Sequence, residues 1–370
     1  MTNSVEPNRV AMIMGKMIGG GVEAVTMNYY RNIDRKKIQF DFIVDEDSTN
    51  IPRQEILELG GRILVVPSYK NILKYNETLD GIFKENQYSI VHSNVNSLSV
   101  FPLRIAKKNH IPIRIAHNHS TSSYKEILKN GVKYFLKQWA TKYATHYMAP
   151  TMNTGKWLFG NEVEIKVLPN AIDLVAFRYD DIQRQKIRDE LGYSSSDYVI
   201  GNVGRLVSQK NHLFLISVFA TYKKENPDAK LLIIGEGPLK RKLNQLAKKL
   251  GVFDDVKILP NTSNISKMYS AMDLLIFPSL YEGLGMVAVE AQVSQLPVLL
   301  SDSVPNEVVI SQNVYYLNLK KSITEWSNMI SKIRIENSNL SRLEREFSPE
   351  NYDIKKKAIE LVDYYIKILS

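Results

Sequence analysis

The stretch YVIGNVG at residues 198–204 has the form of a short buried strand that runs into a glycine turn. Similar apolar runs follow it, separated by helical stretches: KLLIIG at 230–235, VKIL at 256–259, DLLIF at 273–277 and PVLL at 297–300. Alternation of buried strands with helices is typical of a parallel sheet covered by helices. Residues 176–348 are therefore predicted to form a doubly wound, Rossmann-like domain.

The chain before this domain carries the same pattern. Its apolar runs are RVAMIM at 9–14, FDFIV at 40–44, RILVV at 62–66, SIVHS at 89–93, IRIAH at 113–117 and HYMA at 146–149. The chain has 370 residues, more than the ~250–300 at which a single core usually stops growing, so residues 1–175 are predicted to form a domain of their own. A linker is expected near 170–180. Residues 349–370 predict a helix with an apolar stripe, for which the first domain is one possible partner.

Composition restricts the class of protein. With 44% hydrophobic and 24% charged residues the chain is predicted to be globular, and its lack of cysteine excludes disulfides, thiolate metal sites and a thiol nucleophile. No apolar run approaches the ~20 residues of a membrane span, so a cytoplasmic protein is expected. The net charge of +9 permits nucleic acid, phosphorylated substrates or an anionic membrane surface as partners.

Glycine-rich turns mark the expected binding edge. Ligands of open parallel sheets bind beyond the carboxyl ends of the strands, so two such domains facing each other would form a cleft there. In the first domain Gly20 and Gly21 precede a helix, where backbone amides can approach a phosphate. The sequence there matches neither a Walker loop nor GxGxxG, so a flexible turn remains the alternative.

Two cations follow the first strand of the second domain. In GRLVSQKN at 204–211, Arg205 and Lys210 come directly after Gly204. Arginine can grip a phosphate with two hydrogen bonds and lysine acts as a point charge, so these side chains predict an anion site, with plain solvent exposure as the alternative. The next strand ends in a second tight turn that contains Gly235 and Glu236.

Two glutamates stand eight positions apart in YEGLGMVAVEAQ at 281–292. No lysine or arginine lies beside them in the sequence, so Glu282 and Glu290 are expected to be unpaired. Gly283 and Gly285 place the first in a loop and the second in the first turns of a helix. The alternative is that both are ordinary surface charges. Carboxylates accept hydrogen bonds from hydroxyls, and helix amides hold phosphates, so together they predict a nucleotide-sugar site.

Five motifs in order resemble the retaining glycosyltransferases of family four, which have the GT-B fold. They are GGGVE at 19–23, LPNAID at 168–173, GRLVSQKN at 204–211, GEGP at 235–238 and PSLYEGLGMVAVEA at 278–291. The resemblance covers nearly the whole chain and extends to bacterial enzymes of capsule, exopolysaccharide and lipopolysaccharide synthesis. It implies an α/β protein with two Rossmann-like domains facing a central cleft.

The resemblance also implies roles for residues. Arg205 and Lys210 would contact the donor diphosphate, Glu290 the ribose and Glu282 the donor sugar. His117, after the strand IRIAH, is the best match to a catalytic histidine of the family, and His119 is a weaker one. The implied donor site comprises Gly20, Gly21, Asn170, Gly204, Arg205, Lys210, Gly235, Glu236, Glu282, Gly283, Gly285 and Glu290.

The implied reaction is transfer of a hexosyl unit from a nucleotide sugar, a UDP-sugar in our prediction, to a hydroxyl of a glycan or lipid-linked acceptor, with retained configuration. The six histidines are scattered along the sequence, which predicts no metal and no other cofactor. Arg205 and Lys210 would neutralise the leaving group instead. One departure from the family is Gln295, where a glycine is usual.

The acceptor side is predicted from a basic segment. In residues 122–143 four lysines recur at intervals of four among apolar residues, namely Lys125, Lys129, Lys133 and Lys137. The two interpretations are a solvated helix face and a segment that touches anionic lipid, which would make the protein peripheral at the inner face of a membrane.

Rival functions are a nucleotide-sugar epimerase with the same fold and a non-catalytic partner subunit. The first does not account for YEGLGMVAVEA, and the second would more often have lost one of the four charged residues of the donor site. Nucleic-acid binding is disfavoured because no aromatic stacking platform accompanies the basic residues. The donor sugar, the acceptor and the oligomeric state cannot be read from the sequence.

Overall fold

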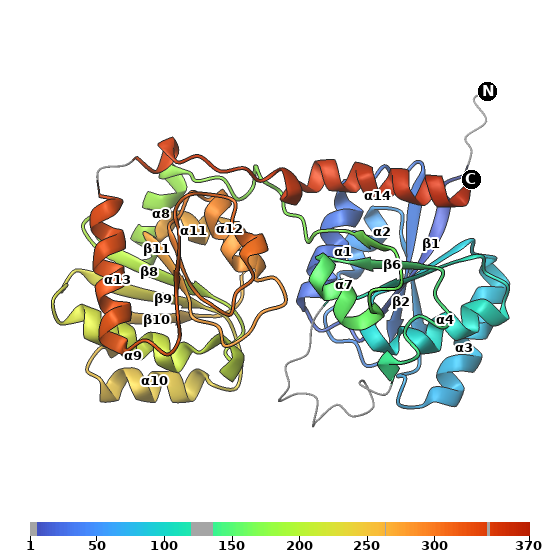
Figure 1. Ribbon diagram of the computed structural model, residues 1–370, viewed down its shortest axis with the longest axis horizontal. Helices are drawn as coiled ribbons and strands as arrows, with labels where there is room; N and C mark the ends of the chain where they lie inside the picture. The colour runs from blue at the N-terminus through green and yellow to red at the C-terminus, as the bar shows by residue number, and fades with distance from the viewer. Residues whose placement is uncertain (1–5, 120–135, 263, 339–340) are drawn as a thin grey trace. The chain divides into compact units, whose positions relative to one another are not determined.

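The structure is a computed structural model that describes residues 6–119, 136–262, 264–338 and 341–370 (Figure 1). The chain divides into two compact units. Unit 1 comprises residues 1–173 and 350–370, and unit 2 comprises residues 174–349. Each unit is a parallel sheet with helices packed against it, so the predicted α/β class with two Rossmann-like domains is confirmed.

Unit 1 contains a seven-stranded parallel sheet in the order β3-β2-β1-β4-β5-β6-β7. The strands are β1 (Asn8–Gly15), β2 (Ile38–Asp45), β3 (Arg62–Val66), β4 (Ile90–Ser93), β5 (Ile113–His117), β6 (His146–Ala149) and β7 (Ile165–Val167). The described helices are α1 (Gly21–Asn32), α2 (Arg53–Glu58), α3 (Ile72–Asn86), α4 (Val100–Lys108), α7 (Met152–Phe159) and α14 (Ile354–Leu369).

Alternation along the strands of unit 1 divides its core between the two faces of the sheet. In β1, Val10 and Met12 pack in a cluster with α1, α2 and α14. The intervening Ala11 and Ile13 pack in a second cluster with α3, α4 and α7. Because both faces are covered, the strands are mostly apolar, as their sequence predicted.

The last helix of the chain belongs to unit 1. α14 buries Ile354, Ala358, Leu361, Val362 and Tyr365 in the same cluster as α1. The chain enters it through a hydrogen bond from the amide of Ile354 to the carbonyl of Ile172, at 3.1 Å. The apolar stripe that the sequence showed is therefore covered by the first unit.

Unit 2 contains a six-stranded parallel sheet in the order β10-β9-β8-β11-β12-β13. The strands are β8 (Tyr198–Val203), β9 (Ala229–Ile234), β10 (Val256–Leu259), β11 (Leu274–Phe277), β12 (Val298–Ser301) and β13 (Val314–Leu317). The described helices are α8 (Asp181–Leu191), α9 (His212–Lys223), α10 (Lys240–Lys249), α11 (Ile265–Ala271), α12 (Met286–Val293) and α13 (Ile323–Glu336).

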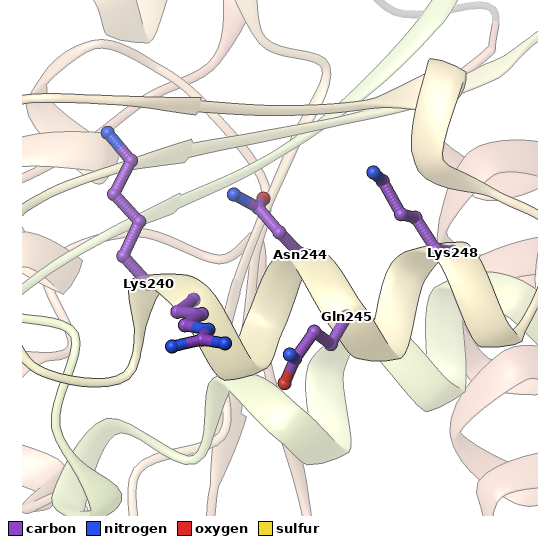
Figure 2. A pocket seen from close by; sticks show the side chains of 5 residues that line it. Lys240, Asn244, Gln245 and Lys248 are labelled. Atoms are coloured by element: carbon purple, nitrogen blue, oxygen red, sulfur yellow. The ribbon is translucent and has the colours of Figure 1, made fainter.

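One face of this second sheet is covered by α9, α10 and α13, which share a core with strands β8, β9, β11 and β12. α10 presents a basic outer surface. Figure 2 shows Lys240, Asn244 and Lys248 projecting from one side of the helix, and Arg241, Lys242 and Lys249 are also exposed. This basic surface was not predicted from the sequence.

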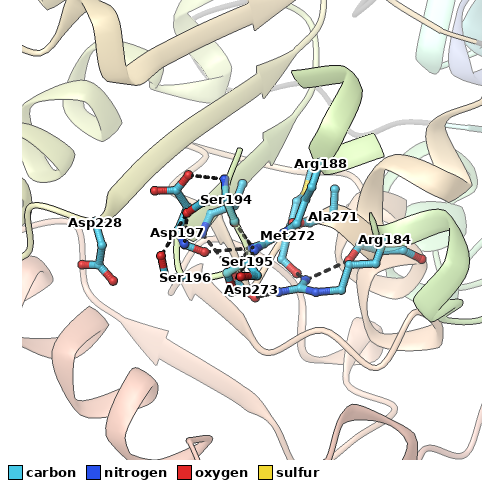
Figure 3. Close-up of polar contacts among 12 residues, drawn as sticks. Arg184, Arg188, Ser194, Ser195, Ser196, Asp197, Asp228, Ala271, Met272 and Asp273 are labelled. Atoms are coloured by element: carbon cyan, nitrogen blue, oxygen red, sulfur yellow. Dashed lines mark hydrogen bonds and ion pairs between the residues drawn. The ribbon is translucent and has the colours of Figure 1, made fainter. Parts of the chain in front are cut away.

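A buried ion-pair network joins α8 to the start of β11 (Figure 3). The two carboxylate oxygens of Asp273 form ion pairs with Arg184 and Arg188, each with an N–O distance of 2.6 Å. It also accepts the amide of Val199, at the start of β8, at 2.7 Å. Arg188 is 1% exposed. The network lies at the amino ends of two adjacent strands, opposite the edge where ligands of such sheets bind, so we assign it a structural role.

Two elements were not predicted from the sequence. Helix α8 lies in the polar stretch between the expected linker and the first strand of unit 2, and β13 forms an edge of the sheet. β13 has the sequence VYYL, in which every residue is only half-buried. Lys125, Lys129 and Lys133 of the predicted basic segment lie outside the described residues.

Candidate functional site

The turns after β8 and β9 pack backbone against backbone at the carboxyl edge of unit 2. The amide of Gly204 bonds to the carbonyl of Ile234 at 2.9 Å, and that of Leu206 bonds to the carbonyl of Glu236 at 2.8 Å. A Cβ atom at Gly235 would lie 2.0 Å from the carbonyl oxygen of Gly204, so no larger residue fits there. This packing fixes the loop that carries Arg205 and Lys210.

The two predicted cations occupy different environments. Arg205 is exposed, and within the described part of the chain its side chain has no hydrogen-bond or ion-pair partner. Lys210 ends a short 3-10 turn, Ser208–Lys210, and its side chain is only 14% exposed. Its Nζ lies 4.6 Å from the centroid of the Phe277 ring, at the end of β11. One cation is therefore free to meet an anion, and the other is held inside the site.

The prediction that the two glutamates are unpaired is wrong for Glu282, which has a lysine partner, whereas Glu290 has a tyrosine partner. Glu282 Oε1 lies 2.6 Å from Lys210 Nζ. Glu290 Oε2 accepts a hydrogen bond from the hydroxyl of Tyr269, on α11, at 2.6 Å. Neither partner was predictable from the local sequence, because they lie 72 and 21 residues away along the chain and come from other loops and helices.

Burial raises the pKa of Glu290 above that of an ordinary glutamate. The hydrogen bond from Tyr269 and the charge of Lys210 oppose this rise without cancelling it. The influence of Lys210 on Glu290 shows that one cation acts on both carboxylates. Tyr269 itself was not identified from the sequence, since an isolated tyrosine on a helix carries no signal of a site.

Helix α12 begins directly after Gly285, which lies in the left-handed region with φ at +91°. A side chain would strain the backbone there, so the glycine is required for the turn into the helix. The first amides of α12 have no partner within the helix. They share the carboxyl edge of the sheet with the half-buried Gly283 and Glu282, a combination of amide donors and a carboxylate acceptor.

In unit 1, α1 starts at Gly21 with Gly20 as its N-cap residue, and no side chain caps it. The carboxylate of Glu23 accepts the amide of Ile18 at 2.9 Å and so fixes the glycine loop. Asn170 follows the last strand, and its Oδ1 is buried without a partner among the described residues. An unsatisfied buried amide oxygen is costly, which makes Asn170 available for a ligand donor.

His117, the last residue of β5, and His119, two residues later, differ in exposure. His117 is 2% exposed, whereas His119 is half-buried. Their rings are in contact, with centroids 3.9 Å apart and an interplanar angle of 30°. The backbone amide of His119 bonds to Asn96 Oδ1 at 2.7 Å, and its Nε2 lies 2.9 Å from Asn94 Oδ1. Of the pair, His119 is the one that a ligand would meet first.

Lys137 is the one member of the predicted lysine series that the structure describes. Its Nζ lies 4.8 Å from the centroid of the Trp157 ring, on α7, and the side chain is half-buried. Across the described residues no group of three or more His, Cys, Asp or Glu side chains could hold a metal ion. No described helix is long and apolar enough to cross a membrane.

Two Rossmann-like units with glycine turns at the carboxyl edges of their strands define a protein of the GT-B class. Residues 19–175 match the family described as Glycosyltransferase Family 4, and residues 183–346 match Glycosyl transferases group 1. "Putative glycosyltransferase EpsF" of Bacillus subtilis (strain 168) is 31% identical over 96% of both chains. The chain therefore belongs to the family-four glycosyltransferases, and it is a transferase that acts on sugars.

Two further relatives have informative names. The UDP-Gal:alpha-D-GlcNAc-diphosphoundecaprenol alpha-1,3-galactosyltransferase of Escherichia coli is 23% identical and covers 98% of this chain and 97% of its own. The crystal structure of Anabaena Alr3699/HepE in complex with UDP-glucose has a TM-score of 0.80 at 16% identity, over 97% of this chain and 99% of the other. The latter likeness confirms the predicted GT-B fold.

Proposed function

We propose that the protein transfers a hexosyl unit from a UDP-sugar to a hydroxyl of a glycan or lipid-linked saccharide during synthesis of a surface polysaccharide, with retained anomeric configuration. The observation that carries this proposal is the ion pair between Lys210 and Glu282. It places a cation for a diphosphate and an acceptor for sugar hydroxyls side by side, at the edge where Rossmann-like sheets bind ligands.

The site residues have complementary roles in this proposal. The exposed guanidinium of Arg205 and the ammonium of Lys210 hold the diphosphate. Glu290 accepts hydrogen bonds from the ribose hydroxyls, and Glu282 accepts them from the sugar. Glycines at 204, 235, 283 and 285 let the backbone approach the ligand, and Glu236 lies beside them in the turn after β9.

The reaction exchanges one glycosidic bond for another. The bond between the anomeric carbon and the diphosphate oxygen breaks, and a bond forms to the acceptor oxygen. The acceptor proton passes to the departing phosphate oxygen, so atoms and charge balance. As the bond breaks, negative charge develops on the diphosphate, and Arg205 and Lys210 stabilise it there without a divalent metal. In this proposal His117 is the catalytic histidine of unit 1, and His119 acts on the acceptor side.

The UDP-sugar assignment is supported by the names of two relatives, one a galactosyltransferase that uses UDP-Gal and the other a protein crystallised with UDP-glucose. To test it, the thermal midpoint would be measured with UDP, GDP and ADP and with their sugars. A UDP ligand at about 100 times its dissociation constant should stabilise the fold by about 2.7 kcal/mol. Chelator should change neither binding nor turnover, and a preference for another base or a metal requirement would contradict the proposal.

The acceptor proposal includes contact with an anionic membrane surface. The acceptor named for the Escherichia coli relative carries diphosphoundecaprenol, a lipid carrier. In this chain the lysines at 125, 129 and 133 form one basic series, and α10 supplies a second basic surface.

A vesicle experiment separates the two surfaces. Lys125→Glu with Lys133→Glu should weaken sedimentation with anionic vesicles more than Lys240→Glu with Lys248→Glu, the matched charge reversal on α10. Added salt should reduce the binding, since the screening length is about 8 Å at physiological ionic strength. Equal binding by the first variant and the parent protein would contradict the role of that series.

A further inference from the structure

A connected group of polar side chains runs through the interior of unit 1, from α14 to the carboxyl end of β5. The hydroxyl of Tyr365 lies 2.6 Å from His92 Nδ1, on β4. His92 Nε2 lies 3.0 Å from His117 Nδ1, and the His117 ring contacts that of His119, with centroids 3.9 Å apart. Tyr365, His92 and His117 are 0%, 1% and 2% exposed, respectively. The last helix of the chain is thereby linked to the histidine pair at the end of β5.

All three histidines of this group are neutral at physiological pH. Burial lowers the pKa of His92 and of His119 to about 3, and that of His117 well below its usual range. A neutral imidazole has one N–H donor and one acceptor nitrogen. The hydrogen bonds from Tyr365 to His117 can therefore run in only two directions, and each direction fixes the tautomer of both rings.

The hydroxyl of Tyr365 decides between the two directions. Burial raises its pKa far above the ordinary value, so the hydroxyl keeps its proton. Among the described residues the only hydrogen-bond partner of this hydroxyl is His92 Nδ1. The opposite direction would leave the phenolic proton buried without an acceptor, which is costly. The hydroxyl therefore donates to His92 Nδ1, His92 donates from Nε2 to His117 Nδ1, and His117 carries its own proton on Nε2.

We propose that Tyr365 and His92 are positioning residues that hold His117 as the Nε2–H imidazole. His117 Nε2 is buried and has no partner among the described residues. It is an unused donor beside the half-buried His119, and it offers a proton to a hydroxyl oxygen instead of accepting one as a base. That this oxygen belongs to a bound sugar, directly or through a water, rests on the proposed function; the tautomer does not.

The tautomers can be measured without any ligand. Long-range proton–nitrogen correlation spectra of the full chain, labelled with nitrogen-15 histidine, distinguish Nδ1–H from Nε2–H rings, and single His→Gln variants assign the signals. We expect His92 and His117 both as Nε2–H in the parent protein. Either ring as Nδ1–H would overturn the proposal, and this result does not depend on the folding of any Tyr365 variant.

A pair of tyrosine variants tests the link to α14. Tyr365→Phe removes the donor at the start of the group, and the spectra of both His92 and His117 should change. Tyr364→Phe is the matched control, because that half-buried ring lies against His146, with centroids 6.2 Å apart, and outside the group. It should leave both spectra as in the parent protein. Unchanged His117 signals in Tyr365→Phe would contradict the positioning role.

Kinetic measurements then distinguish the positioning role of Tyr365 from the proposed function of the protein. Tyr365→Phe should lower kcat about tenfold, the effect of about one net hydrogen bond, while affinity for UDP stays within twofold because unit 2 binds it. Equal kcat for the Tyr365→Phe and Tyr364→Phe proteins would refute positioning and leave the proposed function intact. Absence of sugar transfer by a parent protein with the expected tautomers would refute the proposed function alone.

Discussion

Lys210 and Glu282 form an ion pair of 2.6 Å between Nζ and Oε1, with side chains only 14% and 7% exposed. The pair joins the loop after β8 to the loop after β11, and the ring of Phe277 covers the ammonium. Lysine has three N–H donors, so one can serve Glu282 while others meet a diphosphate. The cation and the carboxylate that were predicted as separate contacts therefore form one structural unit.

Loss of the Lys210 charge should weaken nucleotide binding. Lys210→Met keeps much of the apolar stem but removes the donors and leaves Glu282 without its partner. A charge-assisted hydrogen bond contributes about 1.5–3 kcal/mol, so the dissociation constant for UDP should rise by roughly 10- to 100-fold. Calorimetry measures it, with Lys248→Met on α10 as the control. Unaltered affinity would show that the ammonium does not contact the diphosphate.

The two glutamates should affect different kinetic constants. Glu290→Gln should weaken binding of both the donor and free UDP, because contacts to ribose are the same in the ground and transition states. Glu282→Gln should lower kcat with little change in UDP affinity, since the charge on the sugar grows as the bond breaks. Calorimetry beside steady-state kinetics separates them. If both variants lose UDP affinity alike, the assignment of roles is wrong.

The raised pKa of Glu290 predicts an acid-sensitive donor site. As the pH falls, this carboxylate takes up a proton before an exposed glutamate would, and the protonated group is a poorer acceptor for ribose hydroxyls. UDP affinity should therefore begin to fall above the ordinary glutamate range. Glu290→Gln should flatten that pH profile, and a parent profile that stays level through the range would count against the ribose contact.

For the stability of the fold, the raised pKa of Glu290 has the opposite consequence, because the charge that favours UDP binding disfavours folding. A carboxyl whose pKa is raised on folding destabilises the fold at neutral pH, where its charge must be kept in a buried place. Glu290→Gln removes that charge and retains an oxygen to accept the Tyr269 hydroxyl. It should raise the thermal midpoint while it weakens UDP binding. A fall in both quantities would indicate that Glu290 is structural.

Asp273 should be one of the more sensitive positions for the stability of unit 2. Asp273→Asn leaves Arg184 and the buried Arg188 without their counter-charge (Figure 3). Removing one partner of a buried pair costs about 3–5 kcal/mol. The exposed pair of Glu336 with Lys332 provides the control, and Glu336→Gln should cost less than about 1 kcal/mol. Urea unfolding of both variants checks the contrast, and equal losses would contradict it.

The fold was predictable from sequence because buried strands in a doubly wound protein are nearly continuous apolar runs. β8 and β11 are examples, because each strand is a mostly apolar run that is buried along most of its length. β13 was missed because an edge strand with half-buried residues lacks that run. For the site, the loops and the glutamates were identified from spacing. The partners of those glutamates, Lys210 and Tyr269, are set by tertiary packing, which no local pattern encodes.

Gln295 stands where the family usually has a glycine, and the structure shows how the turn accommodates this residue. It lies in the left-handed region with φ at +56°, so the turn after α12 keeps the conformation that a glycine would adopt. Its Nε2 donates to the carbonyls of Leu343 and Arg345, at 3.2 and 3.0 Å. These bonds offset the strain of about 1 kcal/mol that a side chain carries in this region.

Two substitutions at this position separate the strain from the bonds. Gln295→Ala keeps the strained backbone and loses both hydrogen bonds, so stability should fall by about 1–3 kcal/mol. Gln295→Gly loses the same bonds but relieves the strain, and should cost roughly 1 kcal/mol less than the alanine variant. Urea unfolding of the two proteins measures the difference. If the glycine variant is the less stable of the two, the left-handed backbone at this position carries no strain for the side-chain bonds to offset.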